Sequence, residues 1–434
     1  MKRPALTILF LLFLLCSLSA ASEPATEAEV HLIKVEGVIN PVMSEYIGKG
    51  IEEAEKGASA LVIQLDTPGG LDPSMRDIVK AILSSRVPVV VHVAPSGARA
   101  ASAGVFITYA AHIAAMAPGT NIGSAHPVPM GGGEMDEVMM KKIENDAVAY
   151  IKSIATKRGR NAEWAEKAVR ESVNITSREA LKLGVIDLMA DSTEELLEKI
   201  DSKKVETEAG TITLKTKGAT VKEIDMGLRL KILNAISNPN VAYILMMIGL
   251  VGLYFELSNP GTIFPGVIGA ICLILDFYAF QTLPVNYAGL ALIGLSLIFF
   301  IAETQVTSFG LLAIGGVISL ILGSLMLFES PLPFMRVSMG VLLPTVIMVS
   351  LSIIVIMYYA VRLHKKRPVS GMEGLIGEEG VVVERVSEKG GRIFVDGEYW
   401  YATADEPIEK DTKVRVVAVK GFRLKVERIK EDEQ

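Results

Sequence analysis

The chain has 434 residues, of which 50% are hydrophobic, and its mean hydropathy is +0.41. These values exclude a single soluble domain, because such a chain must place part of its length in lipid. The net charge is only -6 and the basic residues are scattered, which argues against a nucleic-acid partner. Cys16 and Cys272 both lie in apolar segments, so we expect neither a disulfide framework nor a thiolate metal site. We also assign no other metal site and no cofactor.

The N-terminus has the three-part pattern of a secretory signal peptide, which we assign to residues 1–21. A basic Met1-Lys2-Arg3 precedes an apolar run over 5–18, and the small residues Ser19 and Ala21 stand where a cleavage site requires them. An uncleaved anchor is the alternative. Both interpretations place the following domain outside the cytoplasm.

Residues 28–200 alternate short β-branched runs with amphipathic stretches, which predicts α/β units around a largely buried sheet. We expect strands over 31–35, 60–65, 87–93 and 112–116, and helices over 41–56, 72–84, 103–110 and 137–158. A further helix over 177–183, capped by Thr176 or Ser177, precedes a strand over 185–188. His92 and His112 are interpreted as ordinary strand residues.

One turn in this region has the features of a nucleophile site. Ser102 stands between the run 87–93 and the helix over 103–110, within the small-residue stretch Gly97–Gly104. Small residues let a substrate backbone approach, and the N-terminus of a helix favours negative charge on a bound oxygen. Taken alone, the turn is also compatible with simple tight packing.

Residues 201–236 are charged, contain a predicted hairpin at 211–215, and are interpreted as a linker. The following region, 237–362, contains about five apolar segments of nearly spanning length, near 241–258, 262–281, 285–302, 309–328 and 337–361. Basic residues over 362–367 predict that the last span ends in the cytoplasm. In an alternative, the first two segments form a re-entrant hairpin. Asp276 and Glu303 are candidates for functional or pairing roles.

Residues 370–430 contain five predicted strands, over 380–386, 392–395, 398–402, 413–419 and 423–428, which fit a small all-β barrel of OB type. Trp400, between Tyr399 and Tyr401, is interpreted as a core residue rather than part of a binding face. The barrel lacks a basic stripe interleaved with aromatic residues, so we expect an assembly or adaptor role.

Three motifs carry a family resemblance: Asp66-Thr67-Pro68-Gly69-Gly70, Gly97–Gly104, and Ala117-Pro118-Gly119-Thr120-Asn121-Ile122-Gly123. Together with the order of the domains, they make the chain resemble long-form NfeD proteins. The resemblance implies a signal peptide, a serine protease domain of Clp-protease-like (crotonase-like) fold, a multi-span membrane region and an OB-fold tail. Each motif alone is weak, because other crotonase-like folds use similar turns without proteolysis.

The same resemblance implies a Ser-Lys dyad, with Ser102 as nucleophile and Lys142 as general base. A lysine accepts the serine proton only in its uncharged form. Lys141 is the neighbouring alternative to Lys142. The backbone N–H of Ala103, with that of Gly70 or Gly69, is the implied donor pair of the oxyanion hole.

A Ser-His-Asp triad is the rival interpretation, because His126 lies close to where the Clp proteolytic subunit carries its catalytic histidine. The corresponding acidic position falls on Ser172, and Asp187 lies too far along its strand. A carboxylate to orient His126 is therefore missing from this pattern. The glycines over 131–133 suggest a mobile loop over the site.

We therefore expect a membrane-anchored serine endopeptidase that cleaves hydrophobic peptide segments, with its protease domain outside the cytoplasm and its barrel inside. The resemblance implies the C-terminal region of a partner stomatin as substrate, and a homodimer or larger homo-oligomer. The alternative is a non-proteolytic membrane scaffold that organises stomatin-like proteins through the barrel.

Overall fold

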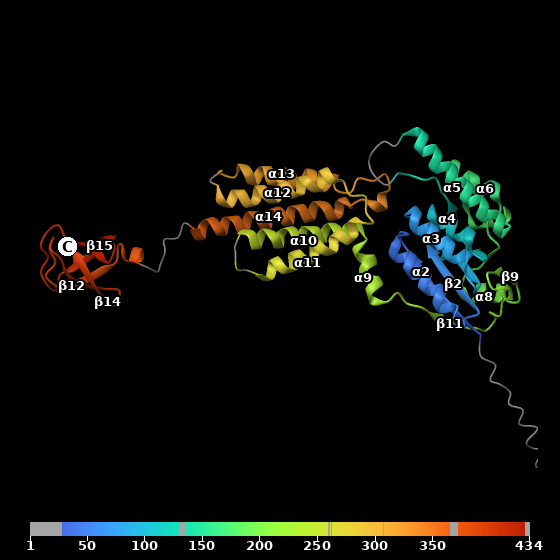
Figure 1. Cartoon of the computed structure of the whole chain (residues 1–434), viewed down its shortest axis with the longest axis horizontal. Coiled ribbons are helices and arrows are strands. Elements are labelled where there is room, and N and C mark those ends of the chain that lie inside the picture. Colours follow the sequence, from blue (N-terminus) through green and yellow to red (C-terminus); the bar gives the residue numbers. More distant parts are fainter. Residues whose placement is uncertain are drawn as a thin grey trace, which may run out of the picture. The chain divides into compact units, whose positions relative to one another are not determined.

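The computed structural model describes residues 28–129, 136–258, 261, 263–306, 308–364 and 372–429. The chain divides into two units, Met1–Glu303 with Ser308–Ser350, and Thr304–Thr307 with Leu351–Gln434. The first unit holds an α/β domain and most of a helical region, and the second holds the end of the last helix and a barrel (Figure 1). The predicted signal peptide over 1–21 lies outside the described residues.

A six-stranded parallel sheet forms the centre of the α/β domain, in the order β11-β1-β2-β3-β5-β8. Its strands are β1 (Glu29–Glu36), β2 (Ala60–Asp66), β3 (Val89–Val93), β5 (Ile113–Met116), β8 (Leu188–Met189) and β11 (Thr220–Glu223). Along β2, Leu61 and Ile63 enter one hydrophobic core, and Ala60 and Val62 enter another. Burial on both faces explains why these strands read as continuous apolar runs.

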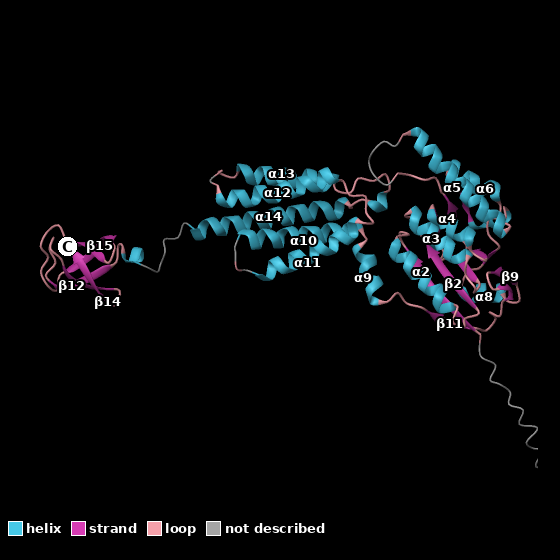
Figure 2. Ribbon diagram, in the orientation of Figure 1, coloured by secondary structure: helices cyan, strands magenta, loops and turns pink. Residues whose placement is uncertain are grey.

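Two sets of elements cover the two faces of this sheet (Figure 2). The larger core is closed by α2 (Pro41–Ala54), α3 (Asp72–Leu83), α4 (Ala103–Ala110), α5 (Glu137–Arg158), α6 (Ala162–Arg170) and α7 (Ser177–Lys182). The other core is closed by α8 (Thr193–Ile200) and the hairpin of β9 (Lys204–Thr207) and β10 (Gly210–Thr213). Thr176 caps α7 as predicted, in a capping box with Glu179.

Two sequence predictions for this part of the chain are wrong. Residues 201–236 are not a linker, because β11 pairs with β1 and α9 (Leu228–Ile236) places Leu230 in the larger core. The strand predicted over 185–188 begins only at Leu188, because the N–H groups of Val185 and Ile186 donate to the Ala180 carbonyl and close a turn after α7.

A small three-stranded sheet was not predicted. It consists of β4 (Arg99–Ala101), β6 (Asn121–Gly123) and β7 (Asn174–Thr176), with β4 and β6 parallel and β7 antiparallel to β6. Strands of three residues are too short to show an alternating pattern in the sequence. This sheet holds the turn that contains Ser102.

Five apolar helices follow α9, namely α10 (Pro239–Ser258), α11 (Ile263–Phe280), α12 (Tyr287–Gln305), α13 (Leu311–Met326) and α14 (Met339–His364). Among the described residues, four stretches are long and apolar enough to cross a membrane: α10, α11, α12 and Pro333–Val355. The remaining helix, α13, has only 16 residues. The five predicted segments are thus five helices, of which four reach spanning length.

Contacts at the ends of these helices indicate an antiparallel arrangement. The N–H of Ser338, just before α14, donates to Asn240 Oδ1 at the start of α10 (2.8 Å). The N–H of Asn286, just before α12, donates to the carbonyl of Leu327 after α13 (2.8 Å). Leu283, after α11, shares a pocket with Met335 from the turn η1 (Pro333–Met335). Despite its length, α13 therefore runs back to the end at which α10 and α14 begin.

The second unit contains a closed five-stranded barrel in the order β12-β13-β14-β16-β15, preceded by the turn η2 (Met372–Leu375). Its strands are β12 (Glu379–Glu384), β13 (Gly391–Val395), β14 (Glu398–Thr403), β15 (Lys413–Lys420) and β16 (Arg423–Arg428). Trp400 packs partly buried against the barrel core, whereas Tyr399 and Tyr401 are exposed. The predicted fold class, an α/β domain followed by a helical membrane region and a small barrel, is confirmed.

Glycines allow close packing between neighbouring membrane helices. A Cβ on Gly269 of α11 would lie 2.8 Å from the carbonyl oxygen of Gly249 in α10. A Cβ on Gly323 of α13 would lie 2.7 Å from that of Gly289 in α12. Small residues at such contacts let the helix backbones approach closely. Close packing stabilises helix pairs in lipid, because apolar side chains gain little by exchanging contacts with lipid tails for contacts with another helix.

Replacing Gly269 with valine should destabilise the α10–α11 pair, because the added carbons would meet backbone atoms rather than a side chain that can rotate away. We expect a loss of about 1–3 kcal/mol, as for overpacked cores, measured by thermal unfolding of the full-length protein in detergent. Gly294→Val in α12 is the matched control, because the space around Gly294 is open. Equal destabilisation by both variants would contradict this account.

Candidate active site

Ser102 lies in a strained turn between β4 and α4. Its φ is 52° and its ψ is -111°, in a part of backbone space that residues other than glycine seldom adopt. The turn is held in place, because the Ser102 N–H donates to the Gly123 carbonyl (3.0 Å) and the Ala101 N–H donates to the Thr67 carbonyl (3.1 Å). Strain that is held in this way is typical of functional positions.

The loop after β2 passes directly against Ser102. Gly69 in this loop has a φ of 116°, and a Cβ there would lie 2.7 Å from Cβ and 3.2 Å from Oγ of Ser102. Any other residue would therefore displace the serine hydroxyl. Glycine at this position keeps the approach to the hydroxyl open.

Backbone amides near Ser102 form a candidate oxyanion hole. The N–H of Gly69 is engaged, since it donates to Thr67 Oγ1 (3.0 Å). Within the part of the chain that the structure describes, the N–H groups of Gly70 and Ala103 have no hydrogen-bond partner. Free donors of this kind can bind an oxygen that becomes negatively charged. The geometry thus favours Gly70 over Gly69 as the partner of Ala103.

Ser102 and Lys142 line one pocket with a volume of about 580 Å³, together with Gly70 and Ala103. Lys142 is exposed and lies near the start of α5, whereas Lys141 does not line the pocket. Most of the wall is apolar and includes Pro68, Leu71, Pro73, Met75, Phe106, Ala125, Pro127, Val128, Pro129, Ile143 and Ala147. The pocket thus brings a serine hydroxyl and a lysine amine into mostly apolar surroundings.

An arginine on α3 anchors the part of α5 that carries Lys142. Arg76 forms ion pairs with Asp72 of its own helix (2.8 Å) and with Asp146, one turn after Lys142. Its guanidinium carbon lies 4.5 Å from the centre of the Tyr150 ring, which stacks on Phe106 of α4. Sequence reasoning missed Arg76, because a basic residue on an amphipathic helix gives no local signal of partners elsewhere in the fold.

The residues of the rival triad do not come together. His126 does not line the pocket, although Ala125 and Pro127 on either side do, and its Nδ1 is hydrogen-bonded to the Val169 carbonyl (2.9 Å). Asp187 is occupied elsewhere: it forms an ion pair with Arg160 (2.6 Å) and accepts the Ala114 N–H (2.7 Å). The glycines over 131–133, predicted to form a mobile loop, lie outside the described residues.

Two further histidines belong to the buried sheet. His92 Nε2 is hydrogen-bonded to the Ala190 carbonyl (3.0 Å), and the Val89 N–H donates to His112 Nδ1 (3.1 Å). Burial lowers the pKa of both rings, and with the nearby Arg158 it brings the pKa of His112 to about 3. Both rings therefore remain neutral at physiological pH. Among the described residues, no cluster of three or more histidine, cysteine or acidic side chains is suited to a metal ion.

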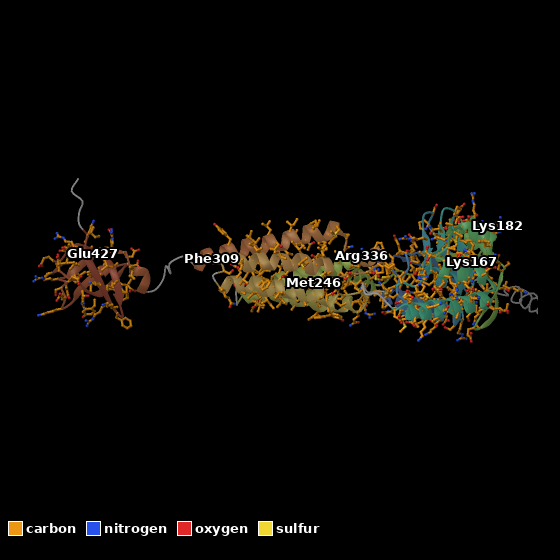
Figure 3. The ribbon with its side chains drawn as sticks, turned by 90° about the horizontal axis from the view of Figure 1, so that it is seen from above. Lys167, Lys182, Met246, Phe309, Arg336 and Glu427 are labelled. Atoms are coloured by element: carbon orange, nitrogen blue, oxygen red, sulfur yellow. The ribbon has the colours of Figure 1, made fainter. Side chains whose placement is uncertain are left out.

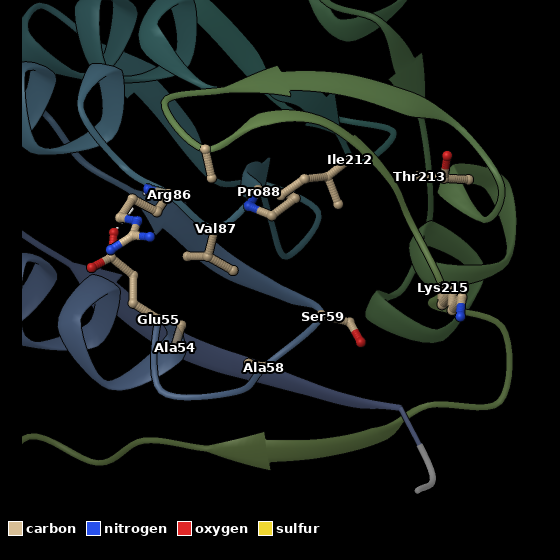
Figure 4. Close-up of a pocket in the computed structure, with 11 residues that line it drawn as sticks. Ala54, Glu55, Ala58, Ser59, Arg86, Val87, Pro88, Ile212, Thr213 and Lys215 are labelled. Carbon is tan, nitrogen blue, oxygen red and sulfur yellow. Dashed lines mark hydrogen bonds between the residues drawn. The ribbon is translucent and has the colours of Figure 1, made fainter. Parts of the chain in front are cut away.

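A second pocket, of about 400 Å³, lies beside the β9–β10 hairpin (Figure 4). Its polar side chains are Glu55, Ser59, Arg86, Thr213 and Lys215, and the Glu55 carboxylate accepts the Arg86 N–H (2.8 Å). None of the residues predicted for the active site lines it. The pocket that contains Ser102 is therefore the candidate active site.

Comparison with known proteins identifies the family. The models for "NfeD1b, N-terminal domain", "NfeD integral membrane domain" and "NfeD-like C-terminal, partner-binding domain" match residues 29–209, 240–359 and 372–428. The membrane-bound protease PH1510 of Pyrococcus horikoshii is 35% identical over 447 residues, which cover 99% of this chain and 98% of that protein. The chain belongs to the NfeD family. This relationship also makes it a membrane-bound protease.

Similar solved structures include 1510-N of Pyrococcus horikoshii, a membrane-bound stomatin-specific protease. In one of these structures a lysine is replaced by alanine and a substrate peptide is bound. Its sequence is 35% identical to this NfeD protein, and the match covers 49% of this chain and 98% of the 1510-N chain, with a TM-score of 0.45. Another form has a serine replaced by alanine. ClpP1 from Listeria monocytogenes is 20% identical and covers 38% of this chain and 94% of its own, with a TM-score of 0.32.

Replacing Gly69 with alanine should block the site, because the new methyl group would collide with Ser102. We expect the rate at which a fluorophosphonate labels Ser102 to fall at least about tenfold, equivalent to roughly 1.4 kcal/mol of barrier. Gly210→Ala is the matched control, since Gly210 has a similar φ of 107° and open space around it. If the two variants were labelled equally fast, the proposed contact would not govern access to Ser102.

Proposed function

We propose that Ser102 is the nucleophile and Lys142 the general base of a serine endopeptidase whose substrate is an apolar segment of a stomatin-like partner. The observation that carries the proposal is the single pocket lined by Ser102, Lys142, Gly70 and Ala103. The related 1510-N protease, described as stomatin-specific, supports it, since a serine and a lysine of that protein were each replaced in solved structures.

The proposed reaction uses each of these groups in turn. Ser102 Oγ forms a bond to the substrate carbonyl carbon while Lys142 Nζ, in its uncharged form, takes the hydroxyl proton. The N–H groups of Gly70 and Ala103 donate to the oxyanion. The C–N bond then breaks, and Lys142 returns the proton to the leaving amine. Water attacks the resulting ester and gives a proton to Lys142. The ester C–O bond then breaks as Lys142 returns that proton to Ser102 Oγ, which releases the carboxylic acid product and restores the serine hydroxyl.

The apolar wall of the pocket supports a hydrophobic substrate segment, because burying apolar side chains there removes them from water. The barrel supports the assignment of a protein partner, since it matches a family model described as partner-binding. Tyr399 and Tyr401 are exposed on the barrel and offer aromatic surface for such a contact. We also propose that the protein forms a homodimer or a larger homo-oligomer.

We infer that the α/β domain lies outside the cytoplasm and the barrel inside it. The antiparallel order of α10 to α14, with both α10 and α14 starting at one end of the helical region, supports an odd number of crossings. Protease-protection mapping of membrane vesicles of known orientation tests this assignment.

Ser102→Ala and Lys142→Ala should each lower the turnover of apolar peptides by about 10²–10⁴-fold, because each removes a group that acts in the bond-breaking step. The wild-type rate should rise with pH, since only uncharged lysine accepts the serine proton. The measurement is peptide cleavage by the full-length protein in detergent micelles across pH.

Lys141→Ala and His126→Ala are the matched controls, because neither side chain lines the pocket. Both should keep turnover close to that of the wild type. A loss of turnover confined to Ser102→Ala and His126→Ala would show that His126, and not Lys142, is the general base. Peptide cleavage by Ser102→Ala at the wild-type rate would show that Ser102 is not the nucleophile, and would favour the non-proteolytic membrane scaffold.

A further inference from the structure

The connection between α13 and α14 reaches the pocket that contains Ser102. Its residues Leu332, Phe334 and Met335 line that pocket, opposite a set of residues that all come from the α/β domain. We call residues 328–338 the α13–α14 loop. The candidate active site is therefore not made by the α/β domain alone, since part of its wall belongs to the membrane region.

Hydrogen bonds fix the α13–α14 loop in place. The Met335 N–H donates to the Leu332 carbonyl (3.0 Å), which closes the turn η1, and Met335 is only 3% exposed. Ser330 Oγ accepts the Leu332 N–H (3.2 Å), and the Ser330 carbonyl accepts Arg336 Nε. At the end of the loop, Ser338 bonds to Asn240 of α10. The apolar side chains of the loop are thus held by a built turn.

Contacts outside the pocket also join the α/β domain to the helical region. Leu230 of α9 lies in the larger core of the α/β domain, and Tyr278 of α11 packs against the same core. Asn40, which caps α2, donates from Nδ2 to Asn234 Oδ1 (3.0 Å). The approach of the α13–α14 loop to the pocket is therefore supported by packing at separate points.

Phe334 lines two cavities. Its half-buried side chain lines the Ser102 pocket and also a cavity of about 470 Å³ that Asp66, Arg99 and Arg336 line. The Ser102 pocket has charged residues of its own, namely Asp72, Arg76, Lys142 and Asp146, and Phe334 adds apolar surface to it beside Leu332 and Met335. Such a surface is suited to an apolar side chain of a substrate.

The loop also sets the pocket beside the membrane. The apolar stretch long enough to span a bilayer runs over Pro333–Val355, so Phe334 and Met335 stand at its first turn. The end of this stretch that begins at Pro333 is therefore also the end that lines the Ser102 pocket. A buried apolar wall at the membrane edge suits a segment that is itself apolar.

We propose that the α13–α14 loop is part of the substrate site, with Phe334 and Met335 forming the subsite for an apolar side chain of a peptide segment drawn from the membrane surface. The proposal rests on the proposed serine endopeptidase function. It makes the membrane region a determinant of specificity in addition to an anchor. Phe334 binds substrate in this account and takes no part in the proton transfers.

The test uses the full-length protein in lipid nanodiscs and two peptides that differ by one leucine-to-glutamine exchange near the cleaved bond. Phe334→Ala should lower kcat/KM for the leucine peptide about tenfold, mainly through KM, and change the glutamine peptide little. Phe334→Leu should recover most of the loss. Labelling of Ser102 by a small fluorophosphonate should be unchanged, which shows that the variants are folded.

Phe309→Ala is the matched control. Phe309 is fully exposed on the connection between α12 and α13, and Figure 3 places it at the opposite end of the helical region from Arg336. Unchanged leucine-to-glutamine selectivity in Phe334→Ala, or an equal change in Phe309→Ala, would overturn the subsite. Cleavage that persists in Ser102→Ala would instead overturn the proposed function, so the two failures are distinguishable.

A second measurement does not depend on turnover. In Phe334→Cys, an apolar peptide aldehyde that binds Ser102 should slow maleimide labelling of the introduced thiol at least about fivefold, because the bound side chain covers it. The same aldehyde should leave the labelling of Phe309→Cys unchanged. Equal labelling of Phe334→Cys with and without the aldehyde would show that no substrate side chain lies against the loop.

Discussion

The contact between Gly69 and Ser102 is the constraint on which the site depends. The loop after β2 approaches so closely that only a hydrogen fits beside the serine Cβ. This approach leaves the N–H of Gly70 free in the same pocket as the hydroxyl. The parallel sheet makes the contact possible, because β2 and β3 end at the same edge and send their following loops into one region. The strained Ser102 and the free N–H of Gly70 therefore line one pocket.

The proposed general base is positioned by a separate set of interactions. Lys142 lies on an exposed turn of α5, and the helix is held against α3 and α4 through Arg76, Asp146 and the stacked Tyr150. Ionic and aromatic contacts of this kind keep a helix face in register. The pocket therefore combines a serine in a hydrogen-bonded turn with a lysine on an exposed turn of α5, and the α13–α14 loop adds an apolar wall from the membrane region.

The sequence was most informative where the residues that determine a structural feature are close to one another in the chain. The turn that contains Ser102 could be predicted, because the strand, the small-residue turn and the helix α4 are adjacent. The proposal of Lys142 needed a family resemblance, since spacing along a chain does not bring a helix to a turn. Arg76 and Phe334 were missed for the same physical reason: their contacts join segments that are distant in the chain. The error over 201–236 is similar, because a polar edge strand such as β11 becomes visible only through its pairing with β1.

The central claim is that Lys142 activates Ser102 to form an acyl-enzyme. The most direct measurement is mass spectrometry of the full-length protein quenched with acid during turnover of an apolar peptide ester, followed by mapping of the modified residue. The account predicts a single acyl group on Ser102 that forms rapidly in the wild type and in Lys141→Ala but not in Lys142→Ala. Acylation of another residue, or equally fast acylation of Ser102 without Lys142, would contradict it.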